Sequence, residues 1–200
     1  MSQRRNEPDL RASNAIPEST ILDATYSLLL SIGMRRMTMA DIARQADVSR
    51  ATLYRRWGSV REVVGTLITR EFAALAAEAF PTAPASALDA LVSGVVHLVQ
   101  AIRAHPILRK IIEVDPEFLL PYLLQRLGTS TAHQLQQLEA GIAAGAADGS
   151  IRDGDVALQA RTVLLMTLSF TLTAPVLVEG EQLAALDEEL RGALHRYLAP

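Results

Sequence analysis

The chain has 200 residues, of which 50% are hydrophobic and 20% charged, and its formal net charge is -3 at pH 7. This length and apolar content can bury a sizeable core, as one body or as a small domain joined to a larger one. The chain has no cysteine, which excludes disulfides, thiolate-bound zinc and cysteine nucleophiles and agrees with an intracellular setting. The N-terminus lacks the apolar segment of a secretory signal, so we expect a cytoplasmic protein.

The first predicted helix follows a polar N-terminal segment. Residues 1–16 have little apolar periodicity and are expected to form a flexible arm. Pro17 suits a first helical turn, and Gly33 is the residue at which this helix should end. Its apolar face is formed by residues at helical spacing, namely Ile21, Leu22, Thr25, Leu28, Leu29 and Ile32. We expect this helix to brace the two helices that follow it.

The stretch from Thr38 to Trp57 predicts two short helices joined by a tight turn. Thr38 with Asp41 three residues later is typical of a capping box, in which hydroxyl and carboxylate satisfy free amides of the first turn. Ser49 is the expected N-cap of the second helix. Asp47 is expected at the turn between them. It suits this position because aspartate tolerates the left-handed backbone conformation.

The second of these helices has one apolar and one outward face. Leu53 and Trp57, four residues apart, should pack against the first helix, where Ala43 is small enough for a close crossing. We therefore expect Trp57 to be a core residue rather than a base contact. The outward face carries Arg50, Ala51, Tyr54 and Arg55. This is the face that a nucleic-acid duplex would receive.

Basic side chains are concentrated around this stretch, although the whole chain is acidic. Between Arg35 and Arg61 the sequence has seven arginines and only two aspartates, a net charge of +5. Such a patch favours a polyanionic partner. The alternative interpretation is a solvated charged face with no ligand.

The remainder of the chain also predicts helices. Capping patterns after Ser59 and Ser86 begin two of them, and the segment from Pro81 to Pro84 should be the joint between these two. Prolines at positions 106, 116 and 121 divide the next region into short helices. The last three helices are expected at residues 130–147, 155–176 and 181–198. Because no strand alternation or internal repeat is found, the predicted fold class is all-α.

The longest uncharged run does not predict a membrane span. Residues 162–178 fall short of the roughly 20 residues that a bilayer requires, and hydroxyl residues and a proline interrupt the run. We expect a buried helix and no membrane partner.

Residues 17–72 resemble the tetracycline-repressor (TetR) family of bacterial transcription regulators. The resemblance lies in an ordered set of residues: Gly33, Thr38, Asp41-Ile42-Ala43, Ala46, Val48-Ser49, Thr52-Leu53-Tyr54, Trp57 and Gly58-Ser59. It implies a three-helix DNA-binding domain over residues 17–72, with the helix-turn-helix at about 38–57. Residues 106–155 are more loosely similar to the family's C-terminal region, which implies a helical effector-binding and dimerisation domain over residues 73–200.

The same resemblance implies how individual side chains bind double-stranded DNA. Base edges in the major groove would be contacted by Arg50, Ala51, Thr52 and Arg55. Phosphates would be held by Thr38, Tyr54 and Arg56. This division agrees with the chemistry, because arginine pairs with guanine, methyl groups contact thymine, and hydroxyls hold phosphate oxygens without reading sequence.

Two residues depart from the family pattern. Val60 stands where the family usually has a lysine that grips the DNA backbone, so we expect Arg61 or Arg56 to supply part of that contact. Asp47 replaces the usual glycine of the turn. Neither change breaks the motif.

The predicted function is a ligand-responsive transcriptional repressor that binds DNA as a homodimer. One helix-turn-helix contacts few bases, so two recognition helices about 34–36 Å apart on a palindromic operator are expected. The apolar helix at 162–178 and the helix from Ser130 are the candidate dimer surface, unless the intrachain core consumes their apolar sides. The resemblance also implies that a small-molecule effector would move the long helix after Ser59, change the separation of the recognition helices and release the DNA.

Candidate effector-binding residues come from several predicted helices. His97, Gln100 and Arg103 follow one another at intervals of three in an apolar helix. The same cavity could be lined by Phe118, Tyr122, Met166 and Phe170. A cationic effector would require Glu113 or Glu117 near aromatic rings. For each of these side chains, an ordinary structural role is the alternative.

The sequence offers no catalytic or metal-binding pattern. It has no GxSxG, P-loop or HExxH motif, and its four histidines are widely separated. We therefore expect no enzymatic activity, no cofactor and no bound metal ion. The competing function is a helical protein-interaction module that has lost DNA binding, against which the cluster of Arg50, Arg55 and Arg56 argues.

Overall fold

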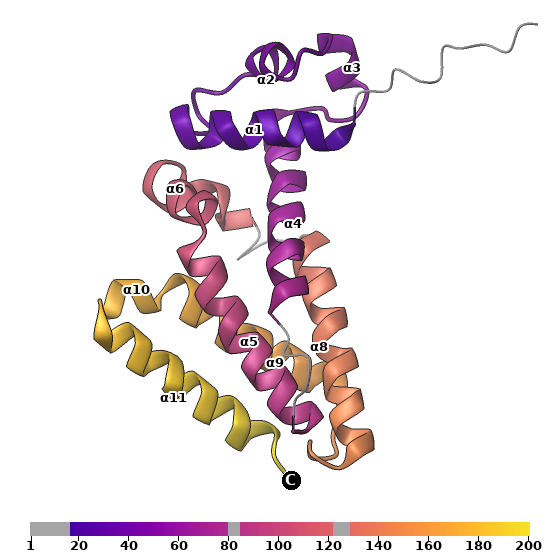
Figure 1. Cartoon of the computed structure of the whole chain (residues 1–200), viewed down its shortest axis with the longest axis vertical. Coiled ribbons are helices and arrows are strands. Elements are labelled where there is room, and N and C mark those ends of the chain that lie inside the picture. The colour runs from indigo at the N-terminus through magenta and orange to yellow at the C-terminus, as the bar shows by residue number, and fades with distance from the viewer. Residues whose placement is uncertain (1–16, 80–84, 122–128) are drawn as a thin grey trace, which may run out of the picture.

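The computed structural model describes residues 17–79, 85–121 and 129–200, and within these ranges the chain is helical without a β-strand (Figure 1). The helices are α1 (Glu18–Ile32), α2 (Met39–Gln45), α3 (Arg50–Tyr54), α4 (Val60–Glu78), α5 (Ala87–Ala104), α6 (Pro106–Val114), α8 (Thr129–Asp148), α9 (Val156–Leu172), α10 (Ala174–Leu177) and α11 (Glu181–Leu198), with a 3-10 turn, η2, at Pro116–Phe118. The predicted all-α fold class is confirmed. The arm at 1–16, the joint at Pro81–Pro84 and Tyr122 lie outside the described residues.

Local side-chain caps begin the helices where the sequence predicts them. Thr38 Oγ1 accepts a hydrogen bond from the Asp41 amide at 3.1 Å, and the Asp41 carboxylate accepts one from the Thr38 amide at 3.0 Å. Hydroxyls of Ser49, Ser59 and Ser86 cap α3, α4 and α5 in turn. These interactions join residues only three apart, so the chain can form them before any long-range contact exists.

Two turns adopt the left-handed backbone conformation that their residues favour. Gly33 ends α1 with a φ of 76°, and Asp47 at the α2–α3 turn has a φ of 53°. Asp47 is the one residue other than glycine with a positive φ among those described. The prediction that Asp47 lies at the turn in the left-handed conformation is confirmed; its short side chain tolerates this conformation.

The first hydrophobic core joins α1, α2 and α3 to the N-terminal part of α4. Ile21, Ile42, Leu53 and Leu67 are completely buried in it. Figure 1 shows α1 lying across the end of α4, with α6 beneath it. This core also takes in side chains from farther along the chain, Ile107, Ile111 and Phe118. The helix-turn-helix unit therefore rests on α6 and η2 as well as on α4.

The second core is built from α5, α8, α9 and α11. Val96, Ile142, Val163 and Leu190 are completely buried in it. By length and composition α5 is apolar enough to cross a membrane, but a core helix passes the same test, and α5 buries eight residues inside the bundle.

The expected single helix over residues 155–176 is wrong, because it divides into α9 and α10 at Thr173. Pro175 has no amide hydrogen for the carbonyl four residues earlier, and its ring would clash with that carbonyl. The helix therefore restarts with the proline in its first turn. The uncharged run at residues 162–178 was expected to be a buried helix, but it is not fully buried. Leu165, Val176 and Leu177 are 68%, 81% and 72% exposed.

Candidate functional site

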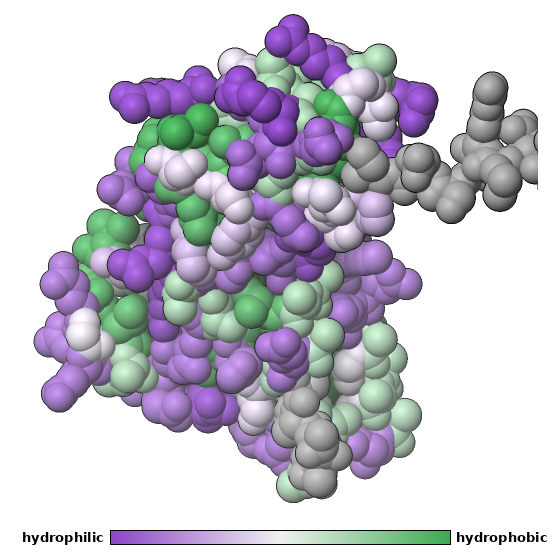
Figure 2. All heavy atoms as spheres, turned by 45° about the horizontal axis from the view of Figure 1, so that its top comes forward, coloured by the Kyte–Doolittle hydropathy of each residue, from purple (hydrophilic) through white to green (hydrophobic). Residues whose placement is uncertain are grey.

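Helix α3 presents its polar face to solvent at one end of the molecule. Leu53 is completely buried and anchors the helix, whereas Tyr54 is 56% exposed. Arg50, Ala51, Arg55 and Arg56 are exposed beside it. Hydrophilic side chains cover much of this end when it is turned toward the viewer (Figure 2). The predicted DNA-facing residues thus share one accessible surface.

Two predicted contact residues also stabilise the helix-turn-helix. Thr38 is exposed and caps α2. Thr52 is half-buried, and its hydroxyl lies 2.9 Å from Ser49 Oγ at the start of α3. A hydroxyl in such a cap can still accept or donate a further hydrogen bond, because it has two lone pairs.

The arginine-rich patch carries less free charge than its sequence suggests. Arg44 pairs with Asp41 at 2.7 Å, and Arg35 pairs with Glu117 at 2.7 Å. Arg36, Arg50 and Arg55 have no ion pair among the residues that the structure describes. Arg36, Arg50 at the start of α3 and Arg55 just after it are therefore available to a polyanion.

Arg61 does not extend this surface as its position after Val60 suggested. Its guanidinium carbon lies 4.9 Å from the centre of the Phe118 ring, and its Nη1 donates to the Phe118 carbonyl at 3.4 Å. The side chain therefore turns toward η2, where stacking on the ring adds to the hydrogen bond.

A buried carboxylate joins the α1–α2 loop to the loop between α6 and η2. Asp115 is completely buried, and its oxygens accept hydrogen bonds from the backbone amides of Met34 at 2.8 Å and Arg35 at 3.2 Å. A side chain at Gly33 would lie only 3.0 Å from Val114 Cγ1, so glycine permits this close approach. No local sequence pattern indicates this contact, because its partners are about 80 residues apart in the chain.

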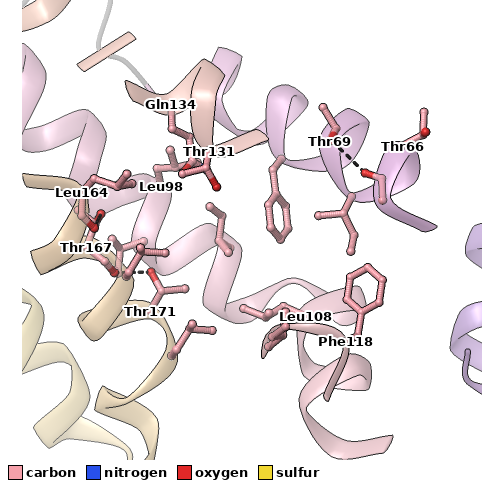
Figure 3. A pocket seen from close by; sticks show the side chains of 18 of the residues that line it. Thr66, Thr69, Leu98, Leu108, Phe118, Thr131, Gln134, Leu164, Thr167 and Thr171 are labelled. Carbon is pink, nitrogen blue, oxygen red and sulfur yellow. Dashed lines mark hydrogen bonds between the residues drawn. The ribbon is translucent and has the colours of Figure 1, made fainter. Parts of the chain in front are cut away.

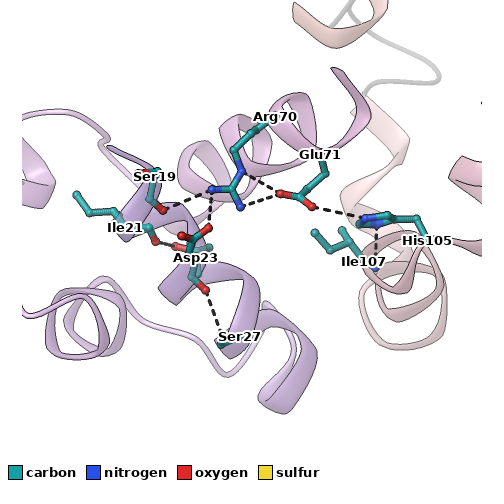
Figure 4. A network of polar contacts seen from close by, with 9 residues as sticks. Ser19, Ile21, Asp23, Ser27, Arg70, Glu71, His105 and Ile107 are labelled. Carbon is teal, nitrogen blue, oxygen red and sulfur yellow. Dashed lines mark hydrogen bonds and ion pairs between the residues drawn. The ribbon is translucent and has the colours of Figure 1, made fainter. Parts of the chain in front are cut away.

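A polar chain ties α1 to α4 and to the start of α6 (Figure 4). Arg70 pairs with Asp23 and with Glu71, each at 2.7 Å. The other oxygen of Glu71 lies 3.6 Å from His105 Nε2. His105 Nδ1 accepts from the Ile107 amide at 3.3 Å, so the proton of a neutral ring lies on Nε2, facing Glu71.

A cavity of about 800 Å³ lies between the two cores. Its walls come from α4, α5, α6 with η2, α8 and α9 (Figure 3). It also reaches Trp57 and Ser59, which lie in the segment joining α3 to α4. Trp57 is 7% exposed, as predicted for a core residue, and its Nε1 donates to Thr66 Oγ1 at 2.9 Å. The cavity size is ordinary for a small-molecule site.

Of the predicted effector residues, Phe118 lines this cavity and the other described ones do not. Helix α5 turns Val95, Leu98, Val99 and Ile102 toward the cavity. Residues at that spacing share one face, which leaves His97 and Gln100 exposed elsewhere on the helix. The prediction for these two residues is therefore wrong for this cavity.

Arg103, Met166 and Phe170 have structural partners instead, and Gln100 shares one of them. Gln100 and Arg103 both bond the buried carboxylate of Asp187 on α11, Arg103 at 2.6 Å and Gln100 at 3.1 Å. Met166 and Phe170 pack against the second core. The sequence did contain a pattern typical of the actual wall, pairs of threonines one turn apart at 66 and 69 and at 167 and 171.

Replacing Thr38 with alanine should destabilise the protein by roughly 1 kcal/mol, because α2 loses its N-cap. The pKa of the Asp41 carboxyl lies below its ordinary value, first because of the Thr38 hydroxyl and then because of the Thr38 amide. The substitution should raise this pKa toward the ordinary value. Urea unfolding would measure the first effect and carboxyl NMR titration the second.

The sign of the pH dependence follows from that lowered pKa. The stabilisation from Asp41 is fully present above the unfolded-state pKa and is lost as pH falls through the folded-state pKa. The difference in stability between the parent protein and Thr38→Ala should therefore narrow under acid conditions. A difference that stays constant at every pH would contradict the role of this carboxylate.

Comparison with known proteins identifies the family. Residues 21–65 match the family of bacterial regulatory proteins named tetR. The chain is 33% identical over 178 residues to an uncharacterized HTH-type transcriptional regulator of Mycobacterium bovis, and the match covers 89% of this chain and 92% of the relative. The chain belongs to the TetR family of bacterial transcription regulators. This TetR-family protein is thus a transcriptional regulator with a DNA-binding helix-turn-helix.

Solved structures of TetR-family repressors have the same fold. The repressor QsdR of R. erythropolis superposes with a TM-score of 0.69 at 15% identity, covering 90% of this chain and 93% of that chain. The repressor AlkX of Dietzia sp., described as implicated in the biodegradation of n-alkanes, superposes with a TM-score of 0.63 at 22% identity, covering 90% and 96%. At these identities the likeness shows the fold alone.

Proposed function

We propose that this TetR-family regulator is a repressor that binds a palindromic operator as a homodimer and is released by a small-molecule effector. The observation that carries the proposal is that the cavity reaches Trp57 and Ser59, which lie in the segment joining α3 to α4. A ligand in the cavity would therefore act on the element that positions the recognition helix. Such a regulator would work in the cytoplasm without a membrane partner or catalytic activity.

Residues 17–72 are the proposed DNA-binding unit. The exposure of Arg50, Ala51 and Arg55 supports their contact with base edges, together with Thr52. The exposure of Tyr54, Arg56 and the cap residue Thr38 supports their contact with phosphates. Helix N-termini and hydroxyls hold phosphate oxygens without reading the sequence, which is why the two groups of contacts differ in specificity.

Residues 73–200 are the proposed effector-binding and dimerisation region. Leu158 and Leu165, two turns apart on α9, are 59% and 68% exposed. The adjacent helix α8 exposes small side chains, among them Ala140, Ala143 and Ala144. Small residues permit close helix approach and the leucines supply apolar area, so this face suits a second copy of the chain.

Replacing Leu165 with glutamate should convert the dimer to a monomer, because two carboxylates would be placed in an apolar interface. Sedimentation equilibrium would measure the association, and operator affinity should fall with it. Gln182→Glu, at an exposed position on α11 and outside α8 and α9, is the control because it adds the same single negative charge. A dimer that survives the Leu165 substitution unchanged would contradict this face.

Selection of bound duplexes from a random pool at about 0.15 M salt is the direct test of the function, because non-specific attraction is partly screened there. A palindromic consensus is the expected result. Enrichment of no sequence would overturn the proposal and favour a helical protein-interaction module. An effector that binds with the same affinity with and without operator would contradict ligand-controlled release, since coupling between two sites is reciprocal.

A further inference from the structure

We infer that the cavity binds an uncharged, largely apolar molecule whose single hydrogen-bonding group is held by Thr131 and Gln134 of α8. The inference rests on the proposed effector role of this cavity and specifies the chemistry of its ligand. It depends on which polar groups of the wall already have partners and on where the charged side chains lie.

Most threonine hydroxyls in the wall are already engaged within their own helices. On α4, Thr66 and Thr69 donate to the carbonyls of Glu62 at 3.1 Å and Gly65 at 2.9 Å. Thr171 on α9 donates to the carbonyl of Thr167 at 2.7 Å. With their hydrogens directed to the backbone, these residues present mainly methyl groups and a spare lone pair to the cavity.

Thr167 completes the same pattern on α9, where its hydroxyl donates to the Leu164 carbonyl at 2.8 Å. Figure 3 shows the hydroxyls of Thr167 and Thr171 turned along the helix. The α9 wall, like the α4 wall, therefore behaves as an apolar surface toward a ligand.

Among the described residues of the wall, the polar side chains without such partners are Thr131, Gln134 and Gln137, and all three come from α8. Thr131 and Gln134 lie three residues apart on α8 and close together at one side of the cavity (Figure 3). Neither side chain has a hydrogen-bond partner among the described residues. A hydroxyl and a primary amide together offer both donors and acceptors, which suits a ligand hydroxyl, carbonyl or ester.

The distribution of charge argues against a charged ligand. Among the described residues, the charged side chains of the wall are Arg56, Arg61 and Glu62, all near the start of α4. Arg61 is stacked on Phe118, and the Glu62 carboxylate accepts from the Gly58 amide at 2.9 Å. The walls from α5, α8 and α9 contain no charged residue. An ionic head group at α8 would lose its hydration without gaining a counter-charge.

Three probes of equal chain length and different head charge test this inference: 1-octanol, octanoate and octyltrimethylammonium. Isothermal titration measures affinity, and Trp57, the only tryptophan of the chain, reports from the cavity wall by its fluorescence. We expect 1-octanol to bind at least tenfold more tightly than either charged probe. Affinity should increase about fourfold per methylene from hexanol to octanol.

Substitutions on α8 locate the head group. Gln134→Leu keeps much of the side-chain volume but removes the amide, and it should weaken 1-octanol binding about fivefold to tenfold. Gln136→Leu is the matched control, because Gln136 is exposed on the same helix and does not line the cavity. Equal losses in the two variants would overturn the assignment to Gln134.

The remaining outcomes separate this inference from the proposed function. Tighter binding of octanoate, abolished by Arg61→Gln, would overturn the uncharged ligand class and leave the effector role standing. Binding of none of the three probes would overturn the ligand class as well. Saturable 1-octanol binding that never releases operator DNA would support the ligand class but contradict effector-controlled release.

Discussion

Replacing Arg50 or Arg55 with alanine should weaken binding to the specific operator by roughly 1–3 kcal/mol, which is about fivefold to 150-fold. Both side chains are exposed, Arg50 at the start of α3 and Arg55 directly after its end. Neither has an ion-pair partner among the described residues, so each is free to pair with a guanine edge. Discrimination should relax at the base pair that each arginine contacts.

Fluorescence anisotropy on operator and on random DNA would measure this prediction. Tyr54→Phe and Arg56→Ala should weaken all sequences more evenly, because phosphate contacts carry no sequence information. Stability should barely change in these variants, since the substituted side chains face solvent. Equal losses on operator and random DNA from all four substitutions would contradict the division between base and phosphate contacts.

Replacing Asp115 with alanine should destabilise the protein by about 2–4 kcal/mol. The substitution leaves the partly buried backbone amides of Met34 and Arg35 without this acceptor, and removes a carboxylate 3.7 Å from Arg35 Nε. Because Asp115 joins the α1–α2 loop to η2, operator affinity should also fall. Urea unfolding monitored at Trp57 would measure the stability change.

Glu117→Gln is the control for the Asp115→Ala substitution. Glu117 also pairs with Arg35, at 2.7 Å, but its side chain is 39% exposed. The pKa of Glu117 lies below its ordinary value because its own backbone amide, and then Arg35, hydrogen bond the carboxylate. An exposed pair of this kind contributes little to stability. Similar losses in the two variants would show that burial of Asp115 is not the cause.

Much of the helix-turn-helix was predictable because its determinants are local. The caps at Thr38, Ser49 and Ser59, the helix end at Gly33 and the turn at Asp47 all depend on residues within a few positions of one another. Helical periodicity also placed Leu53 and Trp57 in the core correctly. The break before Pro175 was missed, because the proline was weighed only against a membrane span and not as a point where the helix ends.

The cavity could not be predicted in the same way. Its wall is assembled from helices distant in sequence, and a choice between adjacent positions of α5 depends on how that helix is rotated in the bundle. One residue changes the direction of a side chain by about 100° on a helix. This is why His97 was expected in the cavity when Leu98 lines it.

The sequence alone was sufficient to predict the all-α class, the helix starts, the left-handed turn and the outward face of α3. Each of these depends on neighbouring residues or on a repeating apolar pattern. Tertiary packing alone decided which arginines form ion pairs, where Asp115 is buried and which described polar groups of the cavity have no partner among the described residues. Those properties depend on contacts between segments far apart in the chain, such as Arg35 with Glu117, and no local pattern specifies them.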